Sequence, residues 1–171
     1  MNKLFLIIGP SGVGKTSAIN NLIPCENLLK FTLDSIIKDY DNEASISKYF
    51  SRIGNKLFFE RSIEAIEKLK SHNHDNIILI DVGAGSFDWP GCIETYLKYP
   101  IISLTGDQEV LYNRILNRQN EKRTLHQYVT SEFMPHKSTL YDKAKFKIDT
   151  SNMNSEEVSQ KISSIVCNSS Y

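Results

Sequence analysis

Residues 4–16 read LFLIIGPSGVGKT, and this stretch decides the fold of the chain. Residues 4–8 are uniformly apolar, which is typical of a strand buried on both faces of a parallel sheet. Residues 9–16 match the pattern G-x-x-x-x-G-K-[ST], and a stretch with helical spacing follows over residues 16–23. A buried strand, a glycine-rich loop and a helix in this order predict a phosphate-binding loop, or P-loop.

The P-loop predicts the binding of a nucleoside triphosphate, which we expect to be ATP, together with Mg²⁺. Glycines in the loop allow backbone angles that other residues rarely adopt, so successive N–H groups can close on phosphate oxygens. Lys15 is expected to reach the β- and γ-phosphates and to act in catalysis, and the Thr16 hydroxyl is expected to bind Mg²⁺. The expected nucleotide-binding residues of this segment are Gly9, Ser11, Gly12, Val13, Gly14, Lys15, Thr16 and Ser17.

Short apolar runs alternate along the chain with longer stretches of helical spacing. This alternation predicts an α/β fold of three layers, α/β/α, with a five-stranded parallel sheet between the helices. The uniformly apolar runs at 4–8 and 77–80 are expected to be central strands, and the alternating run at 145–148 an edge strand. Ser155 is expected to cap the last helix. The expected strands cover residues 4–8, 31–33, 77–82, 101–104 and 146–148, and the expected helices include 16–23, 54–71 and 155–166.

The composition is that of one compact domain, which we expect to span residues 1–171. Lys+Arg and Asp+Glu both total 20, so the chain has no net charge that would attract nucleic acid or an anionic membrane. The apolar runs are far shorter than the ~18–20 residues that cross a bilayer, and we expect a cytoplasmic location and no obligate protein partner. Cys25, Cys92 and Cys167 are far apart in the sequence and are interpreted as free thiols that pack inside the protein.

Asp81 follows the apolar run 77–80 and has two interpretations. Because the carboxyl ends of parallel strands meet at one edge of the sheet, Asp81 is expected to lie beside the P-loop and to bind Mg²⁺ together with Thr16. In the other interpretation, its carboxylate only caps the turn formed by residues 83–85.

The order of these motifs resembles that of shikimate kinase and the related small P-loop kinases over nearly the whole chain. The resemblance implies a fold of the nucleoside-monophosphate-kinase and shikimate-kinase type, with a substrate-binding helical segment at about 34–71 and a lid at about 118–126. The matching pieces are the P-loop, Asp34 with Ile37, residues 45–50 followed by Gly54 and Phe58, the triplet 83–85, the segment ending at 123–125, and Leu140-Tyr141 before Ala144.

The resemblance also implies roles for individual side chains on the acceptor side. The aspartate that matches Asp34 holds the substrate hydroxyl in this family, and a carboxylate near the γ-phosphate can orient an alcohol and accept its proton. Asp34 can alternatively be the N-cap of the helix that follows it. The expected acceptor-side residues are Asp34, which is also expected to be catalytic, and Phe58, Gly83, Ala84, Gly85 and Lys137.

Three arginines lie in or before the expected lid. A guanidinium group can stabilise the charge that spreads over a transferred phosphoryl group, because it offers two donors at once. Arg123 is expected to be catalytic, and Arg114 and Arg118 are expected to bind the nucleotide. The alternative interpretation is that all three belong to a solvated charged helix and loop.

The acceptor half of the chain departs from the family pattern. Thr32 replaces an acidic residue, Thr124 replaces a proline, and Phe59 replaces an arginine that binds the shikimate carboxylate. Arg61 is two residues out of register, which turns a side chain by about 200° on a helix. Lys137 stands where a second carboxylate-binding arginine occurs, so the charge is kept but the bidentate fork is lost.

We therefore expect an ATP-dependent small-molecule kinase that transfers the γ-phosphate to an acceptor hydroxyl. The acceptor can be shikimate, a nucleoside, a nucleotide or a sugar acid. Phe50, Phe58 and Phe59 either line a pocket for a flatter, less acidic compound or belong to the core. Residues 86–88 either touch the substrate or form a plain turn. The alternative function is an ATP-binding regulatory protein with little kinase activity.

Overall fold

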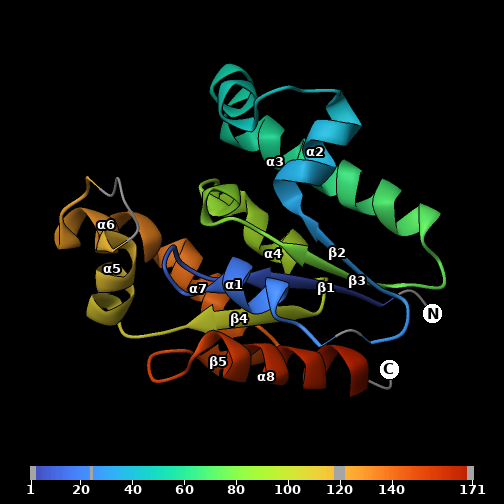
Figure 1. Cartoon of the computed structure of the whole chain (residues 1–171). Coiled ribbons are helices and arrows are strands. Elements are labelled where there is room, and N and C mark those ends of the chain that lie inside the picture. The colour runs from blue at the N-terminus through green and yellow to red at the C-terminus, as the bar shows by residue number, and fades with distance from the viewer. Residues whose placement is uncertain (1–2, 24, 118–121, 169–171) are drawn as a thin grey trace.

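The computed structural model describes residues 3–23, 25–117 and 122–168, and its centre is a five-stranded parallel sheet (Figure 1). The strands are β1 (Lys3–Ile8), β2 (Leu28–Thr32), β3 (Ile77–Asp81), β4 (Ile101–Thr105) and β5 (Phe146–Asp149). Their order is β2-β3-β1-β4-β5, and every neighbouring pair is parallel. The central places of β1 and β3 and the edge place of β5 confirm the prediction made from their apolar patterns.

Helices cover both faces of the sheet and give the expected three layers. They are α1 (Lys15–Asn20), α2 (Leu33–Asp41), α3 (Ile46–His72), α4 (Ile93–Tyr96), α5 (Gln108–Leu116), α6 (Leu125–Glu132), α7 (Pro135–Lys143) and α8 (Ser155–Asn168), with short 3₁₀ helices η1 (Ala84–Phe87) and η2 (Pro90–Cys92). One core lies under α2, α3, α4 and α7, and includes Ile66 and Leu140. The other lies under α1, α5, α6 and α8, and includes Leu111 and Ile162. Figure 1 shows α1 and α8 on the same side of the sheet. Within the described residues, none of the helices is both long and apolar enough to span a bilayer.

The second strand begins earlier than the apolar run 31–33 predicts. β2 covers Leu28–Thr32, and Leu33 is already the first residue of α2. The strand ends at Thr32 because this side chain caps α2, with its Oγ1 accepting a hydrogen bond from the backbone N–H of Ser35 at 3.1 Å. The fully buried Leu33 therefore packs under a helix and not within the sheet.

Two helices differ in detail from the sequence expectation. α3 joins two helical stretches at Gly54, where φ of 78° and ψ of 170° interrupt the helix, so the predicted segment 54–71 is only its second part. α8 begins at Ser155, but the cap is Asn154, whose Oδ1 accepts hydrogen bonds from the N–H groups of Glu156 and Glu157. The prediction that Ser155 is the N-cap is therefore wrong by one residue.

Cys25 and Cys167 form a disulfide, so the prediction of three free thiols is wrong for these two residues. Their Cα atoms are 6.1 Å apart although 142 residues separate them in the sequence. Cys25 lies before β2 and Cys167 in the last turn of α8, so only the folded chain brings them together. Cys92 is buried and free, as the sequence predicts.

Candidate functional site

The loop between β1 and α1 begins at the carboxyl edge of the sheet, where the central strand ends. β1 pairs with β3 on one side and with β4 on the other, and Ile7 is the register partner of Asp81. The segments that follow β1 and β3 therefore leave the sheet side by side. In open α/β sheets this edge is where ligands bind, and most of the predicted site residues lie here.

The backbone of this loop forms a cradle of the kind that binds phosphate. Gly9, Gly12 and Gly14 have positive φ angles of 149°, 84° and 93°. A Cβ atom on Gly12 would lie 2.5 Å from the carbonyl oxygen of Leu111, so α5 leaves no room for a side chain. A Cβ atom on Gly14 would meet no atom within 4 Å, so this side of the loop is open to a ligand. The loop geometry therefore fits a bound phosphate chain.

The side chain of Lys15 folds back over the same loop. Its Nζ donates hydrogen bonds to the carbonyl oxygens of Gly9 at 2.7 Å and Pro10 at 3.3 Å. These contacts hold the ammonium group against the loop. This is the placement that a lysine needs in order to reach phosphate oxygens in the cradle.

Thr16, in the first turn of α1, meets Asp81, the last residue of β3. Thr16 Oγ1 donates a hydrogen bond to Asp81 Oδ2 at 3.2 Å. Burial raises the pKa of Asp81, and the nearby Lys15 and Thr16 partly oppose this rise. A hydroxyl oxygen beside a carboxylate is the hard oxygen donor set that Mg²⁺ prefers. The contact with Thr16 fits the metal-binding interpretation of Asp81 and not that of a turn cap.

Arg114 is held by the segment that follows β5. Its guanidinium group donates to Thr150 Oγ1 at 3.2 Å, to the Thr150 carbonyl at 2.7 Å and to the Ser151 carbonyl at 3.2 Å. These hydrogen bonds hold Arg114 against the protein, so it is not the solvated surface arginine of the alternative interpretation. A hollow of about 160 Å³ at this place is lined by residues that include Gly12, Val13, Gly14, Ser17, Arg114 and Thr150.

Arg123 lies beside the P-loop and is paired with a buried carboxylate, whereas Arg118 lies outside the described residues. Arg123 Nη1 is 2.9 Å from Glu132 Oε1, and its guanidinium carbon lies 5.5 Å from the centre of the Tyr128 ring. The other oxygen of Glu132 accepts a hydrogen bond from the N–H of Ser11 at 3.0 Å, and Ser11 Oγ donates to Oε1 at 2.8 Å. The solvated alternative is therefore wrong for Arg123.

Glu132 is a site residue that sequence reasoning missed. Its side chain is 7% exposed. Burial is the largest influence on its pKa and raises it, but hydrogen bonds from Arg123 and Ser11 together hold this pKa below the ordinary value of 4.5. The sequence does carry a signal, because Glu132 lies on the stripe 125, 128, 129, 132 and 133, whose other members are apolar or aromatic. An acidic residue on a buried helix face needs a partner.

The predicted acceptor residues gather around a pocket of about 320 Å³ beside the P-loop. Asp34 lines this pocket, and because Thr32 caps α2, the alternative role of Asp34 as an N-cap is wrong. Burial raises the pKa of Asp34, and Lys38 partly opposes this rise. The full lining is Asp34, Ile46, Ser47, Phe50, Phe58, Gly83, Gly85, Ser86 and Asp88.

A second hollow, of about 420 Å³, connects the acceptor pocket to the P-loop. The two hollows share Gly85 and Asp88, and the second one also includes Ser11 of the P-loop and the predicted residues Ala84 and Lys137. Lys137 Nζ lies 2.6 Å from Asp88 Oδ1 and donates to the carbonyl of Ser131 at 3.0 Å. Asp88 thus pairs with Lys137 and lines both hollows, and its contact with substrate stays a prediction.

Phe58 and Phe59 have different surroundings, although they are adjacent. Phe58 borders the acceptor pocket, and its ring centre lies 5.1 Å from that of Phe50 in an edge-on arrangement. Phe59 belongs to the core, with its ring 5.0 Å from that of Trp89. Arg61 pairs with Glu64 at 2.8 Å on the surface of α3, so it does not replace the arginine that Phe59 has displaced.

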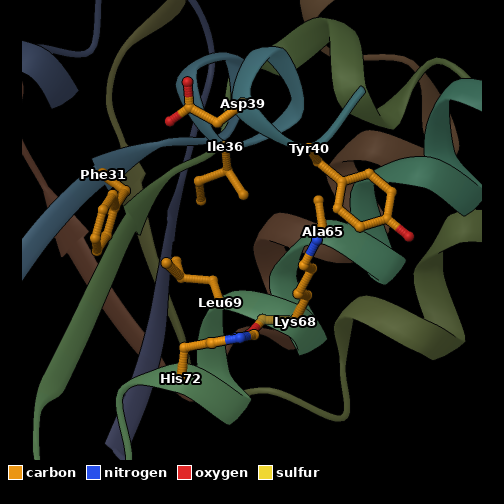
Figure 2. A pocket seen from close by; sticks show the side chains of 8 residues that line it. All are labelled: Phe31, Ile36, Asp39, Tyr40, Ala65, Lys68, Leu69 and His72. Atoms are coloured by element: carbon orange, nitrogen blue, oxygen red, sulfur yellow. The ribbon is translucent and has the colours of Figure 1, made fainter. Parts of the chain in front are cut away.

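A further hollow of about 260 Å³ lies between β2, α2 and α3, away from the P-loop. Figure 2 shows Ile36 and Leu69 facing one another across it, with Phe31 and Tyr40 at its ends. Lys68 lies over the Tyr40 ring, 5.1 Å from its centre. None of the predicted site residues lines this hollow, so it is not a candidate for the reaction described below.

The fold and the loop together define a P-loop protein of the three-layer α/β/α class. Residues 6–135 match the family described as AAA domain, and the chain belongs to this family. No curated protein matches it in sequence.

Solved structures share the fold over nearly the whole chain. Shikimate kinase from Acinetobacter baumannii in complex with shikimate has a TM-score of 0.70 at 21% identity, over 98% of this chain and 93% of that one. Shikimate kinase from Aquifex aeolicus has a TM-score of 0.67 at 19% identity, over 93% and 92%. The tunicamycin resistance protein of Deinococcus radiodurans has a TM-score of 0.67 at 14% identity, over 97% and 96%. The fold is therefore that of the small P-loop kinases, as the order of motifs predicts.

Proposed function

We propose that this protein is a kinase that transfers the γ-phosphate of ATP, bound with Mg²⁺, to a hydroxyl group of a small-molecule acceptor. One observation carries the proposal: the pocket lined by Asp34 shares Gly85 and Asp88 with the hollow that includes Ser11 of the P-loop. Asp34 follows Thr32, the register partner of Asp81, so the Asp34 pocket and the Thr16–Asp81 pair both lie at the carboxyl edge of the sheet. This is the arrangement that a direct transfer between nucleotide and acceptor requires.

On the nucleotide side, the cradle of residues 9–16 holds the phosphate chain through its N–H groups. Lys15 supplies a positive charge to the phosphate oxygens, which supports the transfer because negative charge spreads over these oxygens as the bond breaks. Thr16 and Asp81 would hold the Mg²⁺ ion, which neutralises phosphate charge when bound. Arg114 places a second cation beside the same loop.

On the acceptor side, Asp34 accepts a hydrogen bond from the acceptor hydroxyl and orients its oxygen toward the γ-phosphorus. As the oxygen–phosphorus bond forms and ADP leaves, the hydroxyl proton passes to the Asp34 carboxylate. The raised pKa of Asp34 helps this step, because a carboxylate with a higher pKa is a stronger proton acceptor. Asp34 therefore contributes in two ways: it positions the acceptor hydroxyl, and it accepts the proton of that hydroxyl.

The fold alone does not choose the acceptor. Two of the similar structures are named for shikimate and one for tunicamycin, so the same architecture occurs in proteins named for chemically different compounds. We place the acceptor in the Asp34 pocket, because this pocket reaches the P-loop through the hollow that includes Ser11. The hollow in Figure 2 shares no lining residue with the Asp34 pocket or with the hollow that includes Ser11.

Replacement of Lys15 tests the proposal. Mg·ATP should raise the thermal unfolding temperature of the wild type, since a ligand that binds only the folded state stabilises it. Lys15→Ala should lose this response and the formation of ADP in the presence of an acceptor. Lys143→Ala, which removes an exposed lysine of α7, is the matched control and should respond like the wild type.

The same assay separates a kinase from the alternative of an ATP-binding regulatory protein. A kinase forms ADP in equal amount with a phosphorylated acceptor when shikimate, nucleosides, nucleoside monophosphates and sugar acids are screened. A regulatory protein would show slow ATP hydrolysis that no small molecule changes. An unchanged ATP response in the Lys15→Ala variant would remove the P-loop mechanism altogether.

A further inference from the structure

The ionisable side chains that line the acceptor pocket are both acidic. They are Asp34 and Asp88, and no lysine or arginine stands among the described residues of this lining. The remaining lining is apolar, backbone or hydroxyl in character. An acceptor with a carboxylate or a phosphate group would meet two carboxylates here without an opposing cation, and like charges at close range repel.

Lys137 lines the connecting hollow, and its positive charge is already paired with a carboxylate of the chain. Its side chain is 5% exposed, with Nζ 2.6 Å from Asp88 Oδ1 and 3.0 Å from the carbonyl oxygen of Ser131. Asp88 is the more accessible partner, at 35% exposed, and it lines both hollows. An anionic acceptor group that reached Lys137 would therefore have to compete with the Asp88 carboxylate.

The other cation of the connecting hollow is engaged in the same way. Arg123 is held at 2.9 Å by Glu132, a buried carboxylate that also binds Ser11. Arg61, which follows the pocket residue Phe58 by three positions, pairs with Glu64 on the surface of α3. The two cations that line the connecting hollow, Lys137 and Arg123, thus each have an acidic partner from the chain itself.

The apolar part of the pocket indicates what is bound instead. Phe50 and Phe58 meet edge to face with their ring centres 5.1 Å apart, and Ile46 lies beside them in the lining. A volume of about 320 Å³ suits a compact small molecule. Asp34 provides a strong hydrogen-bond acceptor in the same lining.

We infer that the acceptor is an uncharged hydroxyl compound with an apolar ring portion, and that Asp88 determines this specificity by neutralising Lys137. The inference rests on the proposed kinase function, because it assumes that the Asp34 pocket receives the acceptor. An anionic acceptor such as shikimate is disfavoured, whereas a neutral compound with the same hydroxyl groups is accepted.

Shikimate and its methyl ester test this inference, because they share their ring hydroxyls and differ in the charge of one group. The protein is first saturated with Mg·ADP, so that neither probe can bind in the P-loop, and the affinity of each probe is then measured by calorimetry. The wild type should bind the ester at least tenfold more tightly than shikimate. Asp88→Asn frees Lys137 and should improve shikimate binding at least tenfold, with little effect on the ester.

Asp142→Asn is the matched control, since it removes an exposed carboxylate from the same helix as Lys137 and should leave both affinities unchanged. If Asp88→Asn does not fold, the affinities of Lys137→Gln for shikimate and its methyl ester test the inference instead. The inference expects this variant to keep the wild-type order of affinities, whereas a Lys137 that binds the acceptor carboxylate would lose shikimate.

Three results would overturn the inference. They are a wild type that prefers shikimate, an Asp88→Asn variant with the wild-type ratio of affinities, and the absence of binding by either probe to every variant. Failure of the proposed function is recognised separately, because a protein that is not a kinase would form no phosphorylated product from any compound of the acceptor screen.

Discussion

Asp34 is the side chain on which the chemistry of the proposed transfer depends most directly. Asp34→Asn keeps the shape of the side chain but removes the proton acceptor, and Thr32 still caps α2. We expect the turnover number to fall by about 10²–10⁴-fold, while the affinity for ATP stays at the wild-type value. Coupled ADP detection and calorimetry measure the two quantities. Equal turnover in the two proteins would remove Asp34 from the reaction.

Glu132 makes the stability of the folded protein depend on pH. Its folded pKa lies below the ordinary value of 4.5, which it regains on unfolding, so the unfolded chain binds more protons between these two values. The stability that Glu132 contributes is therefore fully present above about pH 4.5 and is lost as the pH falls through the lowered folded pKa.

Urea unfolding of the wild type from neutral pH down to about pH 3 should show this loss, and Glu132→Gln should show a shallower dependence in the same range. Glu26→Gln, an exposed replacement with the same chemistry, should keep the wild-type slope. Parallel pH dependences in the wild type and Glu132→Gln would contradict the assigned pairing.

At the residue scale, sequence reasoning succeeded where a residue belongs to a local pattern. Lys15 and Thr16 are placed by the P-loop itself, and Asp81 by the end of an apolar run. Asp88 and Glu132 could not be assigned in this way, because their partners Lys137 and Ser11 are 49 and 121 positions away. Such pairs are set by how helices pack, which no short motif records.

The break in α3 at Gly54 is the element-scale feature with the clearest energetic consequence. With φ of 78° and ψ of 170°, Gly54 occupies a backbone region that is open almost only to glycine. The break separates Phe50 from Phe58, and both residues line the acceptor pocket. Gly54→Ala should therefore lower the free energy of unfolding by about 1–3 kcal/mol and weaken acceptor binding.

Chemical denaturation gives the stability of this variant, and Gly83→Ala is the matched control. Gly83 has φ of −64°, and a Cβ atom there would meet no atom within 4 Å, so this change should be tolerated in stability. A Gly54→Ala variant as stable as Gly83→Ala would show that α3 straightens without cost. The break would then not be required to form the pocket.

Element boundaries show why helical spacing predicts some segments and not others. The apolar stripe of residues 54–71 predicts the second part of α3, but residues 46–53 are too few to give a separate periodic signal. Likewise, Leu33 extends the apolar run of β2 in sequence, while the cap at Thr32 assigns it to a helix. Where a helix cap and a continuous apolar run indicate different boundaries, the cap sets the boundary.

At the scale of the whole molecule, the sheet order follows from how apolar each strand is. Uniformly apolar β1 and β3 require cover on both faces, and the alternating β5 tolerates an edge, so these strands could be placed from sequence. β2 is the other edge strand, and its partly exposed residues agree with that place. The disulfide could not be predicted, because the contact between the segment before β2 and the end of α8 depends on the completed fold.

The Cys25–Cys167 disulfide closes nearly the entire chain into one loop, which makes it the covalent bond with the widest effect on stability. A crosslink between residues 142 positions apart restricts the unfolded chain strongly. Breaking it should lower the free energy of unfolding by about 3–5 kcal/mol. The nucleotide site should be unaffected, because α1 separates Cys25 from the P-loop along the chain and both cysteines lie outside the lining of the site.

Denaturant unfolding with and without reductant, together with the double variant Cys25→Ser/Cys167→Ser, measures this contribution. Reductant should destabilise the wild type to about the level of the double variant and have no further effect on the variant itself, since the remaining Cys92 is a buried free thiol. Mg·ATP binding measured well below the unfolding temperature should be the same in all samples. A wild type whose unfolding midpoint does not change with the reductant would show that the two thiols are not joined in solution. The 6.1 Å between their Cα atoms would then reflect only the packing of the end of α8 beside the segment before β2.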